Sequence, residues 1–281
     1  MEYIKLVNGM TVPAIGTGTN SFGKCESRVT SEYNGDFSPV GYALKAGYRM
    51  FDSAIMYGNE DGLGTALKEN GIKRDELILI DKLKIAPGYI ENAEAVKNAV
   101  KSSLLALKTD YIDFYLLHKP WDNEEQMLEA WNALNDLVKE GCIRATAVSN
   151  FNAEKIRLLT SNTGYVPAFN QHAYNSTNWN LTLVEDMKKI SVPSMAYAPL
   201  NLSVSMKEKL SELAVSYGKT WSQMLLRHNY QKGMVSIPKS HKYEHALTNI
   251  SIFDFEINLQ DMKKIDDFIV NDPLIDKKTY L

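Results

Sequence analysis

The sequence predicts an α/β fold, a (β/α)8 TIM barrel that begins with a β-hairpin. Short apolar or β-branched runs alternate with longer helical patterns along the chain, as they do when parallel strands are joined by helical crossovers. Eight such runs fit within 281 residues, and their near-continuous apolar character suits a sheet covered by helices, which favours a closed barrel over an open doubly wound sheet. Asn8-Gly9 lies between apolar positions ahead of the first run and predicts the hairpin, which can close the barrel floor.

The elements follow in order along the chain. The expected barrel strands are 14–19, 50–53, 77–82, 112–118, 143–149, 168–171, 194–198 and 234–238. Among the intervening helices, the one over 122–141 carries an apolar stripe at helical spacing, with Asp122 as its expected N-cap and Gly141 at its end. Thr220 and Gln223 have the spacing of a capping box at the start of another helix.

Composition limits the class of protein. No linker-like stretch or internal repeat divides the chain, so we expect one domain over residues 1–281. A formal net charge of −3 with interspersed signs offers no field for a phosphate backbone, so nucleic acid is not an expected partner. No apolar run approaches the roughly 20 residues of a membrane span and the first residues do not resemble a signal peptide, so a cytoplasmic protein is expected. We expect a monomer or a weak dimer.

The two cysteines, Cys25 and Cys142, are too few for a disulfide framework, and no paired His/Cys spacing indicates a metal site. The stretch from Gly16 to Gly23 begins like a dinucleotide fingerprint. It has Ser21 where the third glycine belongs and no helical pattern directly after it, so we reject a Rossmann site there. Walker and Gly-x-Ser-x-Gly motifs are also absent from the sequence.

Polar residues stand at the ends of three successive apolar strands. Asp52, Lys82 and His118 each follow such a run. In a (β/α)8 barrel these strand ends converge on the face that carries the chemistry. One such residue alone is more often an ordinary polar start of a loop, but three in successive units favour a shared site.

These residues lie within motifs that resemble the aldo-keto reductase family. The first is the stretch 47–60, in which Asp52 and Tyr57 are five residues apart. The other segments that carry the resemblance are Asp81-Lys82-Leu83, Leu116-Leu117-His118-Lys119-Pro120, Ala147-Val148-Ser149-Asn150-Phe151, Phe169-Asn170-Gln171, Ala196-Tyr197-Ala198-Pro199-Leu200 and Ser236-Ile237-Pro238-Lys239-Ser240. They span most of the chain. The resemblance implies an NAD(P)H-dependent oxidoreductase that reduces an aldehyde or ketone.

By this resemblance, Tyr57 is the general acid, Lys82 and Asp52 tune it, and His118 orients the carbonyl. The chemistry fits these residue types. Hydride addition builds negative charge on the carbonyl oxygen, which calls for a proton donor and for stabilisation of that oxygen. A tyrosine with a pKa of about 10 is a weak acid near neutrality. We therefore expect the Lys82 ammonium to lower the pKa of Tyr57 while Asp52 keeps Lys82 charged.

The resemblance also implies a cofactor site. Ser149, Asn150 and Gln171 would bind the nicotinamide carboxamide and Tyr197 would stack on the ring. Lys239 and Ser240 would meet the adenosine 2′-phosphate of NADPH. The remaining expected contacts lie further along the chain, at His245 and Asn249.

Two departures from the family pattern bear on the cofactor. The phosphate motif often continues with arginine and glutamate where this chain has His245 and Thr248. His245 lacks the fixed fork with which arginine binds phosphate, so NADPH is favoured by Lys239 while NADH stays open as a second donor. His172 stands where a glutamate commonly follows Asn-Gln, a change that leaves the proposed proton donor untouched.

The expected substrate side is polar. Asn20, Lys84 and Lys119 occupy positions where many relatives have aromatic residues, and Trp121 can supply one aromatic wall. The substrate is therefore expected to be a small carbonyl compound, with an anionic group as an open possibility. The alternative is that both lysines point into water from the rim.

Two other functions remain open at this stage. A non-catalytic nicotinamide-binding regulatory protein would keep the cofactor site and act through a partner. A barrel aldolase would use Lys82 as a Schiff-base nucleophile, but it would leave the nicotinamide-site resemblance unexplained.

Overall fold

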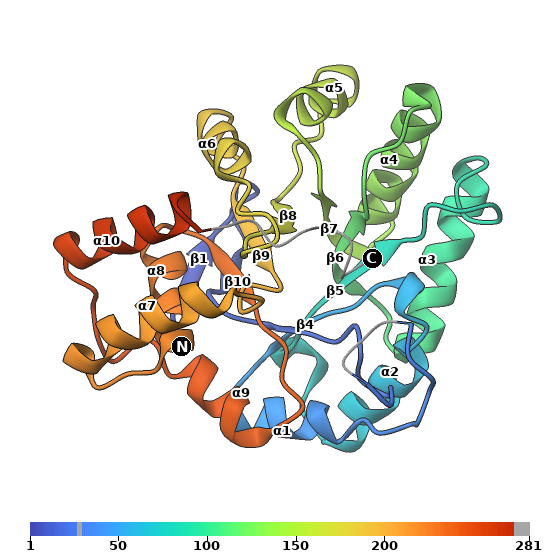
Figure 1. Ribbon diagram of the computed structural model, residues 1–281. Helices are drawn as coiled ribbons and strands as arrows, with labels where there is room; N and C mark the ends of the chain where they lie inside the picture. Colours follow the sequence, from blue (N-terminus) through green and yellow to red (C-terminus); the bar gives the residue numbers. More distant parts are fainter. Residues whose placement is uncertain (27–29, 273–281) are drawn as a thin grey trace.

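The computed structural model describes residues 1–26 and 30–272. An eight-stranded parallel sheet lies at its centre, with helices around it (Figure 1). The barrel strands are β3 (Thr17–Gly18), β4 (Met50–Asp52), β5 (Ile78–Leu83), β6 (Ile112–Leu117), β7 (Ile143–Ser149), β8 (Asn170–Ala173), β9 (Ser194–Tyr197) and β10 (Val235–Ile237). Each strand pairs with its neighbour in the chain, in the order β10 to β3.

The sheet closes into a barrel between its first and last strands. A parallel bridge joins Ile15 to Ser236, and the amide of Gly16 donates to the carbonyl of Ser236 across 2.9 Å. A Cβ on Gly16 would lie 2.6 Å from the side chain of Met50 on β4, so glycine makes room for this methionine beside the seam. The predicted (β/α)8 barrel is confirmed.

Helices α1 to α8 lie between successive strands along the chain, and α9 and α10 follow β10. Their bounds are α1 (Ser38–Ala46), α2 (Glu60–Glu69), α3 (Ala93–Leu107), α4 (Glu124–Lys139), α5 (Ala153–Thr163), α6 (Leu181–Lys189), α7 (Val204–Ala214), α8 (Trp221–Gln231), α9 (Tyr243–Ile250) and α10 (Leu259–Val270), with 3-10 turns η1 (Ile55–Tyr57), η2 (Arg74–Glu76) and η3 (Val215–Tyr217). The capping box of Thr220 and Gln223 is confirmed. The N-cap of α4 is Asn123 and not Asp122, because the Asn123 side chain accepts the amide of Gln126. None of the described helices is long and apolar enough to cross a membrane.

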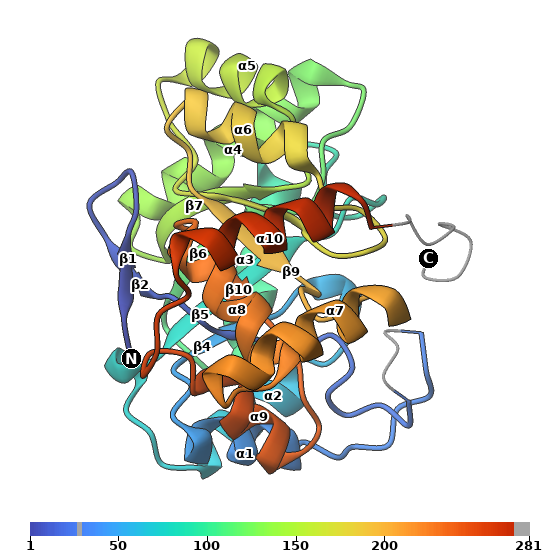
Figure 2. The ribbon, with the colours of Figure 1, turned by 60° about the vertical axis from the view of Figure 1, so that its left-hand side comes forward.

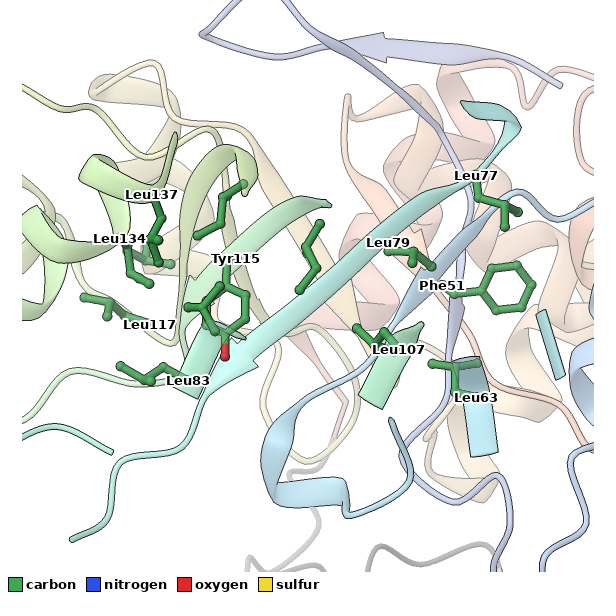
Figure 3. Packing of buried hydrophobic residues seen from close by; sticks show 14 of the residues in the cluster. Phe51, Leu63, Leu77, Leu79, Leu83, Leu107, Tyr115, Leu117, Leu134 and Leu137 are labelled. Atoms are coloured by element: carbon green, nitrogen blue, oxygen red, sulfur yellow. The ribbon is translucent and has the colours of Figure 1, made fainter. Parts of the chain in front are cut away.

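Side chains alternate between two apolar layers along each barrel strand. On β5, Ile80 points into the barrel interior, whereas Leu79 and Leu83 point into the layer between barrel and helices. Figure 3 shows part of this outer layer, where Leu79 lies near Leu63 of α2 and Leu107 of α3. This alternation decides which strand residues reach the barrel interior and the site at its end.

The predicted N-terminal hairpin is also confirmed. Strands β1 (Tyr3–Lys5) and β2 (Thr11–Pro13) pair antiparallel and stand at one side of the molecule (Figure 2). Leu6 and Val12 are buried in the same cluster as the interior strand residues. The hairpin thus covers one end of the barrel and leaves the carboxyl ends of the strands for the site.

Candidate active site

An ion pair between buried side chains lies at the carboxyl ends of β4 and β5. The Lys82 ammonium donates to Asp52 Oδ2 across 2.7 Å and to the Ser53 carbonyl across 2.7 Å. It lies 3.5 Å from the hydroxyl of Tyr57, which η1 presents after β4. The structure thus brings three of the four expected catalytic residues into one chain of contacts.

Charges and burial act on these groups in opposite directions. Burial alone would lower the pKa of Lys82, but the Asp52 carboxylate and its hydrogen bond, together with Tyr57, produce a net rise. Burial raises the pKa of Tyr57 to about 12, against the lowering effect of Lys82. Lys82 thus acts on the pKa of Tyr57 in the expected direction, but the net shift is upward because desolvation of the phenolate outweighs the nearby ammonium.

His118 completes the group and is neutral. Its ring packs edge-on against Tyr57, with 6.2 Å between centroids. Burial lowers the pKa of His118 to about 3, and the charges of Lys82 and Lys119 act in the same direction. Its Nδ1 atom is buried and has no hydrogen-bond partner among the described residues. His118 can thus orient a neighbouring oxygen as a neutral imidazole, but it is a poor source of a proton.

Asn150 connects the strand ends on the other side of the pocket. Its side-chain amide donates to the His118 carbonyl across 3.1 Å and to Ser149 Oγ across 2.9 Å, while the Tyr197 hydroxyl donates to Asn150 Oδ1 across 3.1 Å. Asn150 adopts a φ of +62°, a left-handed conformation that asparagine tolerates better than most residues. Gln171 reaches back to Asp52, with 2.6 Å between Nε2 and Oδ1.

A second polar cluster forms where β10 ends beside the loop after β3. The Lys239 ammonium donates to Asn20 Oδ1 across 2.9 Å and to Ser21 Oγ across 2.6 Å. The His241 ring lies 2.9 Å from the same Ser21 oxygen. Burial lowers the pKa of Lys239 to about 8. Asn20, which we expected to face the substrate, therefore lies against the lysine of the expected phosphate site.

The other expected cofactor residues lie on and before α9. The Ser240 hydroxyl donates to the Lys242 carbonyl across 2.9 Å, which holds the turn that leads into the helix. His245 is exposed on α9, and Asn249 is buried near its end. The segment following β10 thus carries Ser240, His245 and Asn249, the residues expected at the adenosine end of the cofactor.

The expected substrate residues differ in their surroundings. Lys84 and Lys119 are both exposed, and Lys84 lies over the ring of Tyr89, 5.3 Å from its centroid. The Lys119 charge is close enough to His118 to lower its pKa. The Trp121 indole donates to Gln126 Oε1 across 3.0 Å and packs against the edge of the outer apolar layer.

Sequence reasoning missed Ser21 and His241 in the Lys239 cluster. They are 220 residues apart, and only the barrel seam brings them together. It also missed Glu60 and Asp81, although both fall inside the motifs used for the resemblance. The one available signal was a carboxylate in an apolar strand directly before Lys82.

Known proteins resemble this chain over most of its length. The model of the aldo/keto reductase family matches residues 14–270. A glyoxal reductase of Bacillus subtilis is 34% identical over 94% of this chain and 92% of its own, and a methylglyoxal reductase of Escherichia coli O157:H7 is 30% identical over 93% and 91%. The crystal structure of a Bombyx mori aldo-keto reductase in complex with NADP superposes with a TM-score of 0.85, at 32% identity over 99% of this chain and 97% of that one. The chain belongs to the aldo/keto reductase family.

Proposed function

We propose that the protein reduces an aldehyde or ketone to the alcohol, with Tyr57 as the general acid and a nicotinamide cofactor as the hydride source. The observation that carries this proposal is the placement of the buried Lys82 ammonium between Asp52 Oδ2, at 2.7 Å, and the Tyr57 hydroxyl, at 3.5 Å. Two similar proteins are named for the reduction of glyoxal and of methylglyoxal, which are carbonyl compounds.

Each residue of the group has one task in this proposal. The cofactor, when bound, supplies a hydride to the carbonyl carbon. Tyr57 donates its proton to the carbonyl oxygen, and the Lys82 ammonium stabilises the phenolate that remains. Asp52 keeps Lys82 charged and oriented. Neutral His118 orients the carbonyl oxygen toward Tyr57.

The polar residues around the barrel rim suit a nicotinamide cofactor, with NADPH as the favoured form and NADH as a second one. Ser149, Asn150 and Gln171 supply amide and hydroxyl groups for the carboxamide, and Tyr197 supplies a ring face. A phosphate beside Lys239 would offset the desolvation that lowers the pKa of this lysine to about 8. Ser240, His245 and Asn249 would complete the adenosine end.

The site argues against the two other functions. A Schiff-base lysine must be a neutral amine to attack a carbonyl. The raised pKa of Lys82 and its bond to Asp52 keep it charged, which disfavours the aldolase. A regulatory protein without catalysis would have no need for the ordered contacts of Asp52, Lys82 and Tyr57.

The substrate side supports a small carbonyl compound, with keto acids among the good substrates. The charge of Lys119 reaches His118, the residue that would hold the carbonyl oxygen. Lys84 follows Lys82 by two residues and is exposed at the same end of β5. Trp121 would line the side of this pocket. We also propose that residues 1–281 form one domain, in line with the family match over 14–270.

A matrix of cofactors against carbonyl compounds tests the proposal. NADPH and NADH are each combined with glyoxal, methylglyoxal, neutral aldehydes and keto acids, and loss of reduced nicotinamide is followed by absorbance. Turnover that needs both the carbonyl and the cofactor supports the reductase. Binding of NADPH with no turnover of any carbonyl in the matrix would favour the regulatory protein, and carbon–carbon bond cleavage without cofactor would favour the aldolase.

A further inference from the structure

Asp81 lies directly before Lys82 on β5 but points the opposite way. Because strand residues alternate, Lys82 reaches the barrel interior and Asp81 enters the outer apolar layer with Leu79 and Leu83. Figure 3 shows these two leucines with Tyr115 of β6, which pairs with Asp81 in the sheet register. A carboxyl group is thus placed among hydrocarbon side chains, on the far side of the strand from the pocket.

No side chain donates to the buried oxygens of the Asp81 and Glu60 carboxyl groups among the described residues. Asp81 is fully buried, and neither of its carboxyl oxygens has a hydrogen-bond partner among the described residues. Glu60 Oε1 is also buried and has no hydrogen-bond partner among the described residues. Burial raises the pKa of Asp81 well above its ordinary range, and the charge and hydrogen bonding of Glu60 raise it further. The amide and charge of Lys82 act in the opposite direction without reversing this result.

The described groups that face this pair from β6 and α3 are hydroxyl groups. On β6, the Tyr115 hydroxyl lies 3.3 Å from Ser103 Oγ of α3. Burial and then the charges of Asp81 and Glu60 raise the pKa of Tyr115, with a smaller effect of Tyr89. Lys82, on β5 itself, is the cation whose charge reaches Asp81 in this part of the described chain, and Asp52 already holds its ammonium.

An ionised Asp81, fully buried and facing the buried Oε1 atom of Glu60, would be costly, whereas one proton between the two carboxyl groups supplies a side-chain donor and removes one charge. We propose that Asp81 and Glu60 share one proton, and that this hydrogen-bonded pair is a positioning clasp that holds Tyr57 against Lys82. The clasp joins β5 directly before Lys82 to the first residue of α2, three residues after Tyr57. The positioning role rests on the proposed function, in which Tyr57 donates the proton.

The packing of α2 makes such a clasp effective. A Cβ on Gly64 would lie 2.6 Å from the backbone of Leu107, so α2 lies closely against α3 one turn after Glu60. The start of α2 is therefore the part that can respond when the pair ionises. As pH rises through the raised pKa of Asp81, the proton is lost, the carboxylates repel, and Tyr57 moves with the start of α2.

The sign of the effect on stability follows from the raised pKa. The folded state holds this proton at pH values where the unfolded chain has lost it. The free energy of unfolding therefore decreases as pH rises from the ordinary aspartate range through the raised value. Asp81→Asn removes this dependence and keeps a donor for Glu60 at every pH.

The shared proton is tested first by infrared spectroscopy of the whole protein. The C=O band of a buried, protonated carboxylic acid is expected near neutral pH, and it disappears in Asp81→Asn and in Glu60→Gln. Asp113→Asn is the control, because it removes another buried carboxyl of the same sheet, one paired with Arg74 at 2.7 Å, and must leave the band in place. Absence of the band from the parent protein would overturn the proposal. This result needs no activity, so it stands apart from the proposed function.

The positioning role is tested by the pH profile of carbonyl reduction. In Asp81→Asn the alkaline fall of kcat is expected to move up by about one pH unit or more, since the clasp no longer loses its donor. Asp81→Val leaves Glu60 without a partner and is expected to lower kcat about tenfold or more, with the cofactor KM little changed. If the valine variant does not fold, the asparagine profile decides alone. If the infrared band is present but kcat falls at the same alkaline pH in the parent and in Asp81→Asn, the positioning role is overturned.

Discussion

Gln171 Nε2 donates to Asp52 Oδ1 across 2.6 Å, so one carboxylate holds Lys82 with one oxygen and a side chain of β8 with the other. β4 and β8 are separated by three strands in the barrel order, which makes this a contact across the interior. Asp52 therefore fixes both Lys82, which lies beside the proposed proton donor, and Gln171, which is proposed to bind the cofactor. Its loss is expected to affect both.

Tyr57→Phe is expected to lower kcat for carbonyl reduction by about 10²- to 10⁴-fold, the range of one general acid. The change removes the hydroxyl and keeps the ring against His118. Cofactor affinity, measured by fluorescence titration, should be retained. Near-parental turnover in this variant would rule out Tyr57 as the donor.

Lys82→Met is expected to destabilise the fold as well as impair reduction. It leaves Asp52 buried and without its cation, a situation that costs about 3–5 kcal/mol in other proteins. The double variant Asp52→Asn/Lys82→Met removes the unpaired charge and should recover part of this loss. Urea unfolding of the three proteins measures the effect. Equal stability of the single and double variants would show that Asp52 is not penalised by losing its partner.

His245→Arg is expected to tighten NADPH more than NADH, by about 1–2 kcal/mol, because a charged fork can meet the additional phosphate. The matched variant Lys239→Met should weaken NADPH selectively. Calorimetric titration of both cofactors measures both effects. An equal gain for NADPH and NADH in His245→Arg would place position 245 away from the 2′-phosphate.

His118 makes folding sensitive to acid. Its folded pKa of about 3 lies below the ordinary value of 6.5, so the unfolded chain takes up this proton first as pH falls. The free energy of unfolding should therefore decrease across this window, and His118→Gln should lessen the decrease. Urea midpoints at neutral and mildly acidic pH measure the difference. If the free energy of unfolding falls equally with pH in the parent and in His118→Gln, His118 is not a neutral, buried group in the folded state.

Lys84 and Lys119 are expected to favour an anionic substrate. A keto acid should outperform its neutral ester or amide in kcat/KM, and Lys84→Met or Lys119→Met should reduce that preference while sparing a neutral aldehyde. Both side chains are exposed, so each contributes only about 0–1 kcal/mol, and the comparison belongs at low ionic strength. Identical preferences in parent and variants would place both ammonium groups in water at the rim.

The meeting of residues at the strand ends was predictable from the sequence, because parallel strands bring their carboxyl ends together whatever their exact lengths. Asp52 and Lys82 meet as expected, although β3 is shorter than the predicted strand 14–19 and β8 begins two residues later than predicted. The direction of the Tyr57 pKa shift was not predictable. It depends on how much protein surrounds the hydroxyl, and residue spacing does not measure that.

Contacts between distant segments could not be predicted from the sequence either. Asn20 has the same neighbours in the chain whether it faces a substrate or Lys239, and closure of the barrel decides the outcome. Asp81 could be assigned to the outer layer by alternation alone. The effect of Glu60 on Asp81 became visible only in the folded chain, because the two residues lie on different elements.

The contacts of Asn150 limit how this protein can evolve or be recombined with related proteins. The Asn150 side chain bonds to the His118 carbonyl after β6 and to the Tyr197 hydroxyl at the end of β9. Its backbone amide donates to the Gln171 carbonyl of β8. A chimera with a crossover between β6 and β7 separates position 150 from position 118, so each half must arrive with a matching neighbour. Substitutions around Asn150 are thus expected to be epistatic, acceptable in sets and harmful singly.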